Sequence, residues 1–245
     1  MNTNIENAVI LAAGMGTRLR SVTDNMIPKG FLEIEGKGLV QRSIEKLFEA
    51  GIKKVYIATG HLNEFYDKLA EADSRIITMK NENFSNTGSM ASLAIFRDVL
   101  KEDFILLESD LIYETRALEE VINCEKEDCM LLSGKTNSGD EVYIEVKNDN
   151  LSGCSKCKDD IKEIAGELVG ITKVSNSLYK YMIEEYDKSD IQQYHYENTI
   201  IDAAKHKKVG YKKIDDIIWA EIDDESHLER VKRDILPRLR EKGEV

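Results

Sequence analysis

Strand-like and helix-like segments alternate through the first half of this chain, and that alternation limits the fold more than any other feature. One amphipathic stretch, 39–51, places Leu39, Ile44 and Leu47 on one helical face and ends at Gly51, a residue typical of a helix C-terminus. A strand, helix, strand order predicts a mostly parallel sheet with helices on its faces. The apolar, β-branched runs that alternate with such stretches are 8–13, 54–60, 75–79 and 103–109.

After about residue 130 the strand-like runs follow one another more closely. Turn signals occur at 137–140 and 148–150, so we expect hairpins added to the sheet as a lid or substrate-binding part. A last helix is expected from Ser226 to Arg240, because Ser226 and Glu229 have the spacing of a capping box. The later strand-like runs are 129–134, 141–146, 167–174, 208–214 and 217–223.

Charge and hydropathy narrow the classes of partner. The net charge of -12 argues against a nucleic-acid partner, because phosphate backbones require a basic surface. Residues 1–43 are an exception, with five basic and four acidic side chains, and such a segment suits a small anion better than a polymer. No apolar run approaches the roughly 18 residues of a membrane span, and the first residues lack the pattern of a signal peptide. We therefore expect no membrane partner and a cytoplasmic protein.

The segment Leu11-Ala-Ala-Gly-Met-Gly-Thr-Arg-Leu19 delivers two glycines directly from an apolar run into a turn, and Pro28-Lys29 follows. Without a Cβ, glycine lets backbone N–H groups converge on an anion. The spacing differs from the P-loop, because no Lys-Ser or Lys-Thr follows, and from the dinucleotide fingerprint, because Leu19 replaces the third glycine. The segment indicates a phosphate site of another kind.

The pattern L-A-A-G-x-G-T-R-L followed by P-K resembles the signature of the nucleotidyltransferase superfamily, which activates phosphorylated sugars, choline phosphate and related compounds with a nucleoside triphosphate. The resemblance implies that Arg18 contacts the β and γ phosphates and that Lys29 stabilises charge at the α-phosphorus. Preorganised cations suit phosphoryl chemistry, which needs positioning and charge neutralisation more than covalent help. The implied catalytic residues are Lys29 and Arg18. The implied nucleotide-binding residues are Leu11, Ala12, Ala13, Gly14, Met15, Gly16, Thr17, Arg18, Lys29, Asn86, Thr87, Gly88 and Ser89.

Carboxylates follow two of the strand-like runs, at Glu108 and Asp110 and again at Glu221 and Asp223. Open α/β sheets place ligands at the carboxyl ends of their strands, and Mg²⁺ prefers carboxylate oxygens. Local sequence alone also allows a turn role for Asp110 and a helix-cap role for Asp223. The resemblance selects Asp110 and Asp223 as ligands of Mg²⁺, with Glu108, Glu221 and Asp224 as alternatives.

Nearly the whole chain looks similar to the 2-aminoethylphosphonate cytidylyltransferases. This resemblance implies a Rossmann-like α/β fold of the nucleotide-diphospho-sugar transferase type, with a mostly parallel central sheet and an added β-rich acceptor-binding portion. It implies transfer of CMP from CTP to 2-aminoethylphosphonate, with release of pyrophosphate. The expected organisation is one domain over 1–245, with a nucleotide-binding part at about 1–130, an acceptor-binding part at about 131–225 and a C-terminal helix at 226–245. The segments that carry the resemblance are 81–93, 106–114, 133–145, 166–174 and 219–228.

The acid-rich later half favours an acceptor with a primary amine, because an ammonium group has three donors that seek carboxylates. A trimethylammonium group would instead need an aromatic cage, which Tyr143, Tyr194 and Tyr196 could supply. Each candidate could also be an ordinary surface residue, and Lys135 and Lys156 are the candidates for the phosphonate. The candidate acceptor-binding residues are Lys135, Asp140, Glu141, Tyr143, Lys156, Glu167, Tyr194, Tyr196 and Glu197.

Three other functions compete with this interpretation. A choline-phosphate or ethanolamine-phosphate cytidylyltransferase is the nearest, a sugar-1-phosphate nucleotidyltransferase is more remote, and a catalytically silent nucleotide sensor is the third. The sensor is disfavoured because Arg18, Lys29, Asp110 and Asp223 are all present. The four histidines, at 61, 195, 206 and 227, show no pattern of a catalytic set and are interpreted as surface or helix residues.

Overall fold

The computed structural model describes residues 5–245. Within these residues the main sheet has nine strands, with the order β10-β9-β11-β6-β1-β4-β5 along one path, while β8 pairs with both β11 and β12. The predicted α/β fold with a mostly parallel central sheet is confirmed. The strands of this sheet are β1 (Asn7–Ala12), β4 (Lys54–Thr59), β5 (Ile76–Lys80), β6 (Phe104–Glu108), β8 (Cys129–Ser133), β9 (Tyr143–Lys147), β10 (Asn150–Ser155), β11 (Ile164–Val174) and β12 (Gly210–Ile214).

Strand β1 lies at the centre of the parallel region. It pairs in parallel with β4 on one side and β6 on the other, so Ala8 lies opposite both Val55 and Ile105. All six residues of β1 are buried, as the continuous apolar run of a central parallel strand requires. The glycine loop that follows β1 therefore starts from a strand that is held on both edges.

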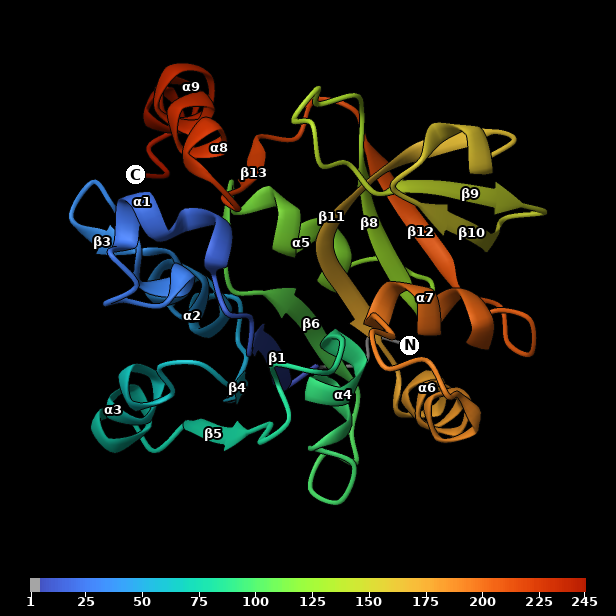
Figure 1. The fold of residues 1–245 in the computed structure, drawn as a ribbon. Coiled ribbons are helices and arrows are strands. Elements are labelled where there is room, and N and C mark those ends of the chain that lie inside the picture. The colour runs from blue at the N-terminus through green and yellow to red at the C-terminus, as the bar shows by residue number, and fades with distance from the viewer. Residues whose placement is uncertain (1–4) are drawn as a thin grey trace.

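Helices cover both faces of the sheet (Figure 1). Val9 and Leu11 of β1 belong to an apolar cluster with α4, α6 and α7, whereas Ala8 and Ile10 belong to a second cluster with α2, α3 and α5. Alternate residues of one strand thus contact opposite helical layers. The helices are α2 (Leu39–Glu49), α3 (Glu64–Ala72), α4 (Ser89–Ala94), α5 (Arg116–Ile122), α6 (Asn176–Lys188) and α7 (Tyr196–Ala203).

The second half of the chain is mainly antiparallel. Strands β9 and β10 form a hairpin whose turn holds Asn148 and Asp149 at positive φ, so the predicted turn at 148–150 is confirmed. The hairpin predicted from the turn signal at 137–140, between the runs 129–134 and 141–146, is wrong, because β8 and β9 both pair with β11 and not with each other. The 11-residue β11 shifts register around Gly170, at φ 82°, which allows one bent strand to pair with β6, β8 and β9.

The chain then returns to the first half through a small second sheet. Strand β13 (Trp219–Glu221) pairs with β7 (Leu111–Tyr113), and the C-terminal helices lie beside α1 (Arg20–Thr23) in Figure 1. A third apolar cluster joins them, with Leu19, Ile112, Ile222 and Leu236 among its members. The remaining elements are η1 (Thr17–Leu19), η2 (Lys29–Phe31), β2 (Glu33–Ile34), β3 (Lys37–Gly38), η3 (Lys158–Asp160), α8 (Glu225–Arg230), η4 (Val231–Ile235) and α9 (Leu236–Glu241).

The predicted capping box at Ser226 is wrong by two residues. Asp224 is the N-cap of α8, and its carboxylate accepts a hydrogen bond from His227 N–H at 3.0 Å. The Ser226 hydroxyl donates to the same carboxylate at 2.7 Å. The helix dipole also stabilises a negative charge at this position, so Asp224 caps the helix in place of Ser226. None of the helices in residues 5–245 combines the length and hydropathy of a membrane span.

Candidate active site

A cavity of about 460 Å³ opens where β1, β6 and β13 end at their carboxyl termini. It is the position that open α/β sheets use for ligands. All residues from 11 to 18 line it, together with Lys29, Thr87, Gly88 and Ser89. Of the predicted nucleotide-binding residues, Asn86 alone lies outside this lining, and its side chain donates to Asn83 at 2.8 Å. The structure thus brings the other twelve predicted positions to one cavity.

The glycine loop turns sharply at Gly16. Its φ of 62° lies in the left-handed region, and a Cβ placed there would approach the Lys29 side chain at 3.3 Å. Leu19 anchors the loop, since its side chain is fully buried and its N–H donates to the Gly16 carbonyl at 3.1 Å. Glycine at 16 therefore permits both the turn and the close passage of Lys29.

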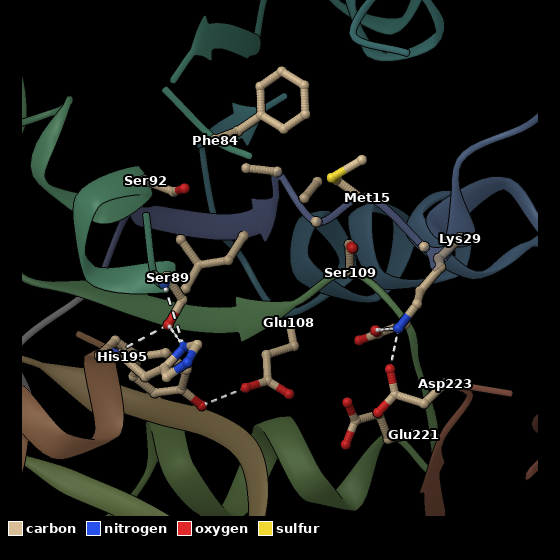
Figure 2. A pocket seen from close by; sticks show the side chains of 18 of the residues that line it. Met15, Lys29, Phe84, Ser89, Ser92, Glu108, Ser109, His195, Glu221 and Asp223 are labelled. Atoms are coloured by element: carbon tan, nitrogen blue, oxygen red, sulfur yellow. Dashed lines mark hydrogen bonds and ion pairs between the residues drawn. The ribbon is translucent and has the colours of Figure 1, made fainter. Parts of the chain in front are cut away.

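Lys29 contacts both predicted metal ligands, Asp110 and Asp223, and Figure 2 shows its side chain directed toward Asp223. Its ammonium Nζ is 3.2 Å from Asp110 Oδ2 and also contacts Asp223 Oδ1. Burial opposes the charge on Lys29, but Asp110 and Asp223 outweigh it and raise the pKa of Lys29 above its ordinary value. Arg18 Nη2 reaches the second oxygen of Asp223 at 2.8 Å. Both predicted catalytic cations thus meet at one carboxylate.

Four carboxylates converge beside Lys29. Ligand oxygens of Glu108, Asp110 and Glu221 all lie within 4.8 Å of one another. Burial and the neighbouring Asp110 and Glu197 raise the pKa of Glu108 to about 8, and burial with Asp110 and Glu108 raises the pKa of Glu221 well above its usual range. Burial also raises the pKa of Asp110 despite the nearby Lys29. Crowded carboxylate oxygens suit a hard divalent cation, which would relieve their repulsion, so these residues fit Mg²⁺.

Asp223 differs from the other three carboxylates. Burial opposes its ionisation, but hydrogen bonds from Glu221 and Lys29 hold the pKa of Asp223 below its usual range. Its backbone N–H donates to the buried His227 ring at 3.3 Å, and the next residue, Asp224, is occupied as the cap of α8. The Ile222 N–H also donates to the Asp110 carbonyl at 3.1 Å. The two predicted ligands are therefore tied together, while Asp224 is directed elsewhere.

The segment 86–89 begins α4, but neither Asn86 nor Thr87 caps it. Gly88 is the N-cap residue and makes no side-chain bond, and Thr87 donates to the Asn83 carbonyl at 3.0 Å. A Cβ on Gly88 would lie 2.4 Å from the Tyr194 carbonyl oxygen. The backbone of Gln193 and Tyr194 therefore packs directly on the start of α4, which leaves no room for a side chain at position 88.

The candidate acceptor-binding residues divide into two groups. Lys156, Tyr196 and Glu197 line the cavity. The Tyr196 hydroxyl donates to Glu108 at 2.8 Å. Glu197 has a raised pKa, caused mainly by burial. These three side chains could contact a second substrate.

The other candidates do not line the main cavity. Asp140, Glu141 and Glu167 line a smaller neighbouring cavity, where Glu167 accepts from both the N–H and the hydroxyl of Thr136. The Tyr143 hydroxyl donates to Glu141, and the Tyr194 hydroxyl donates to Asp202. Lys135 lines neither cavity. Glu141, Tyr143, Glu167 and Tyr194 are thus engaged with other protein groups, and a direct contact of any of these candidates with the acceptor stays a prediction.

Several lining residues escaped the sequence analysis. His195 is the exposed N-cap residue of α7, which agrees with its interpretation as a surface or helix residue, but it also lines the cavity, with its ring 3.3 Å from the Ser89 hydroxyl. No spacing pattern around His195 indicates this position. Trp219 could have been found, because it alternates with Glu221 and Asp223. The other lining residues that were missed are Tyr66, Phe84, Ser92, Ser109, Val142, Leu168 and Gln193.

Comparisons with known proteins agree with this geometry. Residues 7–139 match the family described as Nucleotidyl transferase. A solved structure of the inositol-1-phosphate CTP transferase from T. maritima superposes with a TM-score of 0.83, covers 98% of both chains and is 18% identical in sequence, which shows a shared fold.

Among the curated proteins that are similar in sequence, three span different activities. The bifunctional protein GlmU of Methanococcus maripaludis is 31% identical over 71% of this chain and 41% of its own length. The CMP-5'-(3-aminopropyl)phosphonate synthase of Streptomyces rubellomurinus is 25% identical over 89% of this chain and 37% of its own length. The choline-phosphate cytidylyltransferase of Streptococcus pneumoniae is 22% identical over 88% and 92%. The chain spans about two fifths of the length of the first two of these relatives.

Proposed function

Because the chain belongs to the Nucleotidyl transferase family, we propose that it transfers CMP from CTP to 2-aminoethylphosphonate, releasing pyrophosphate. The observation that carries this proposal is the position of Lys29. Its ammonium lies between Asp110 and Asp223 at the base of the glycine loop, inside a cavity with room for two small substrates. A cation held there can neutralise charge that develops at an α-phosphorus.

The reaction proposed is a direct in-line attack. A phosphonate oxygen of the acceptor is already largely ionised near neutral pH, so no general base is required. It forms a bond to the α-phosphorus of CTP while the bond to pyrophosphate breaks. Backbone N–H groups of the loop and the Arg18 guanidinium orient the triphosphate, and Lys29 contacts the reacting phosphate. The acidic residues Asp110 and Asp223, with Glu108 and Glu221 beside them, would hold Mg²⁺, which supplies further charge neutralisation when bound.

The choice of CTP and of a phosphonate rests on two further observations. Two of the curated relatives are named for cytidylyl transfer or for a CMP-phosphonate product. Within residues 5–245, Glu108, Glu197 and Glu221 form no ion pair with a lysine or arginine, although all three line the cavity. A primary ammonium on the acceptor could donate to Glu197, which is not one of the clustered carboxylates that fit Mg²⁺, while Lys156, which also lines the cavity, could contact its phosphonate.

A choline-phosphate or ethanolamine-phosphate cytidylyltransferase is the second candidate. Trp219 and Tyr196 line the cavity and could face a trimethylammonium head, as the relative from Streptococcus pneumoniae suggests by its name. The Tyr196 hydroxyl is engaged with Glu108, which favours the primary amine instead. The two candidates make opposite demands on the carboxylates and therefore can be separated by the acceptor.

The test is pyrophosphate release with CTP and a panel of acceptors. We expect 2-aminoethylphosphonate to give the highest kcat/KM, ahead of ethanolamine phosphate, choline phosphate and a sugar 1-phosphate. If aminoethylphosphonate is no better than choline phosphate, the acceptor assignment fails. Replacing CTP by ATP, GTP and UTP tests the base, and equal rates with these nucleotides would remove the cytidine assignment.

A further inference from the structure

Asp140 connects the two cationic groups at the cavity mouth. Its Oδ2 is 2.8 Å from Arg18 Nη1, and its Oδ1 is 2.6 Å from Lys156 Nζ. Arg18 follows the glycine loop, whereas Lys156 follows β10 in the acceptor half. One carboxylate thus uses each of its oxygens for a cation from a different half of the molecule.

The exposure of the three side chains shows which of them is held in place. Arg18 and Lys156 have side chains that are 52% and 60% exposed, whereas Asp140 is only 18% exposed. Long exposed cations sample many rotamers in water, and ordering them on binding costs free energy. The less exposed Asp140 limits the rotamers that the Arg18 and Lys156 side chains sample, because each is paired with its carboxylate.

The loop that carries Asp140 is itself anchored. Glu167 on β11 accepts from the N–H of Thr136 at 2.8 Å and from its hydroxyl at 2.7 Å, four residues before Asp140. Glu167 is 4% exposed. The loop that carries Asp140 is therefore attached to the main sheet by the buried Glu167 carboxylate.

On the basis of the function proposed above, we propose that Asp140 is a positioning residue that presents Arg18 to the triphosphate and Lys156 to the phosphonate of the acceptor. Arg18 Nη2 lies on Asp223 while Nη1 lies on Asp140. When phosphate oxygens compete for Nη2, the contact with Asp140 keeps the guanidinium at the mouth. Asp140 acts through the two cations and does not itself contact the amine.

This arrangement predicts an unusual kinetic pattern. Asp140→Asn keeps the shape of the side chain but removes its charge, so both cations lose their common partner. We expect KM for CTP and KM for the acceptor each to rise about threefold to fivefold, as suits pairs that are partly exposed. Arg18→Lys should raise mainly KM for CTP, and Lys156→Met should raise mainly KM for the acceptor. Lys156→Met should raise KM for the acceptor by a smaller factor in the Asp140→Asn background than in wild type, because Asp140 no longer positions the lysine there.

Asp149 provides a matched control. It also bridges two lysines, Lys126 at 3.0 Å and Lys208 at 3.1 Å, but it lies at the β9–β10 turn. Asp149→Asn removes an equivalent charge and should leave both KM values unchanged. Thermal unfolding of each variant shows whether a loss of folding contributes.

A direct binding measurement separates failure of this proposal from failure of the proposed function. The single tryptophan, Trp219, lines the cavity, so its fluorescence can report CTP binding without any acceptor. We expect Asp140→Asn to weaken CTP binding about threefold to fivefold, which is the range expected for the loss of a partly exposed ion pair. Asp149→Asn should bind CTP like wild type. If wild type turns over and the two asparagine variants behave alike, the role of Asp140 is overturned. A wild-type protein that binds no CTP overturns the proposed function and this assignment with it.

Discussion

The two halves of the cavity are assembled in different ways. The side proposed to bind the nucleotide takes eight consecutive residues, 11–18, which include and follow the end of one buried strand. The side proposed to bind the acceptor is built from positions far apart in the chain, namely Val142, Lys156, Leu168, Gln193, His195, Tyr196, Glu197 and Trp219. A phosphate site can be built from adjacent backbone N–H groups, whereas a site for a varied acceptor requires side chains from several elements. The lining residues of the first half can therefore be predicted from a short stretch of sequence, and those of the second half cannot.

The two halves also differ in charge. Arg18 and Lys29 bring cations from the nucleotide side, and both contact Asp223. Glu197 lies on the acceptor side, and burial raises the pKa of its carboxyl. This contrast predicts that substitutions on one side act on triphosphate chemistry and substitutions on the other act on the acceptor.

The largest effect should come from Lys29→Ala. Removing the ammonium should lower kcat about 10³-fold, because a preorganised charge at a reacting centre contributes on that scale. The measurement is pyrophosphate release, and circular dichroism should show that the fold persists. Lys37→Ala, which removes an exposed lysine paired with Glu45, is the matched control and should keep wild-type turnover. Unchanged turnover in Lys29→Ala would remove its catalytic role.

Asp110→Asn should follow, with kcat reduced about 10²-fold and a higher Mg²⁺ concentration needed for half-maximal rate. The physical reason is the loss of one of the clustered carboxylates that fit the cation. Chelation of divalent metal with EDTA should abolish wild-type activity, and added Mg²⁺ should restore it. Asp216→Asn, an exposed acid paired with Arg116, serves as the control. An Asp110→Asn protein with the wild-type Mg²⁺ dependence would contradict the assignment.

On the acceptor side, Glu197→Gln should raise KM for 2-aminoethylphosphonate about tenfold while KM for CTP changes little, since a hydrogen bond to a charged group contributes about 1.5 kcal/mol or more. Repeating the assay with 2-hydroxyethylphosphonate tests the cause, because that acceptor lacks the ammonium. The difference between wild type and Glu197→Gln should then disappear. An equal increase in KM with both acceptors would show that Glu197 does not recognise the amine.

The smallest effect concerns Glu114, where the β7–β13 sheet joins the two halves. Burial would raise its pKa, but hydrogen bonds from Lys242, Ile218 N–H and Arg116 outweigh burial and hold the pKa of Glu114 below its ordinary value. A lowered pKa stabilises the fold above the unfolded-state pKa of about 4.3, and this contribution is lost as the pH falls through the folded-state pKa. Glu114→Gln should thus lower the free energy of unfolding by about 1–2 kcal/mol at pH 7.

Urea unfolding at pH 7 and at about pH 3 checks the sign of this effect, because the gap between wild type and Glu114→Gln should narrow in acid. Glu229→Gln, at an exposed helical pair with Lys232, is the control and should differ little from wild type at either pH. A gap that widens in acid would contradict the lowered pKa of Glu114.

The sequence by itself determined the features that depend on neighbouring residues. Local backbone preferences and the two-residue period of a strand account for the β1 strand, the glycine turn and the Asn148–Asp149 turn. They also account for the positions of Lys29, Asp110 and Asp223 directly after a turn or a strand. The helix cap at Asp224 was missed by two residues, because Ser226 and Asp224 offer similar chemistry and only the packed chain selects between them.

Only the tertiary structure decided which distant side chains meet. The bend of β11 at Gly170 sets which strands β8 and β9 pair with, and the packing of 192–194 on Gly88 brings His195 into the cavity. Asp140 could be read from the sequence as an acid but not as the partner of Arg18 and Lys156. Short-range conformational preferences are properties of a few neighbouring residues, whereas such contacts depend on strand order and register across the entire sheet.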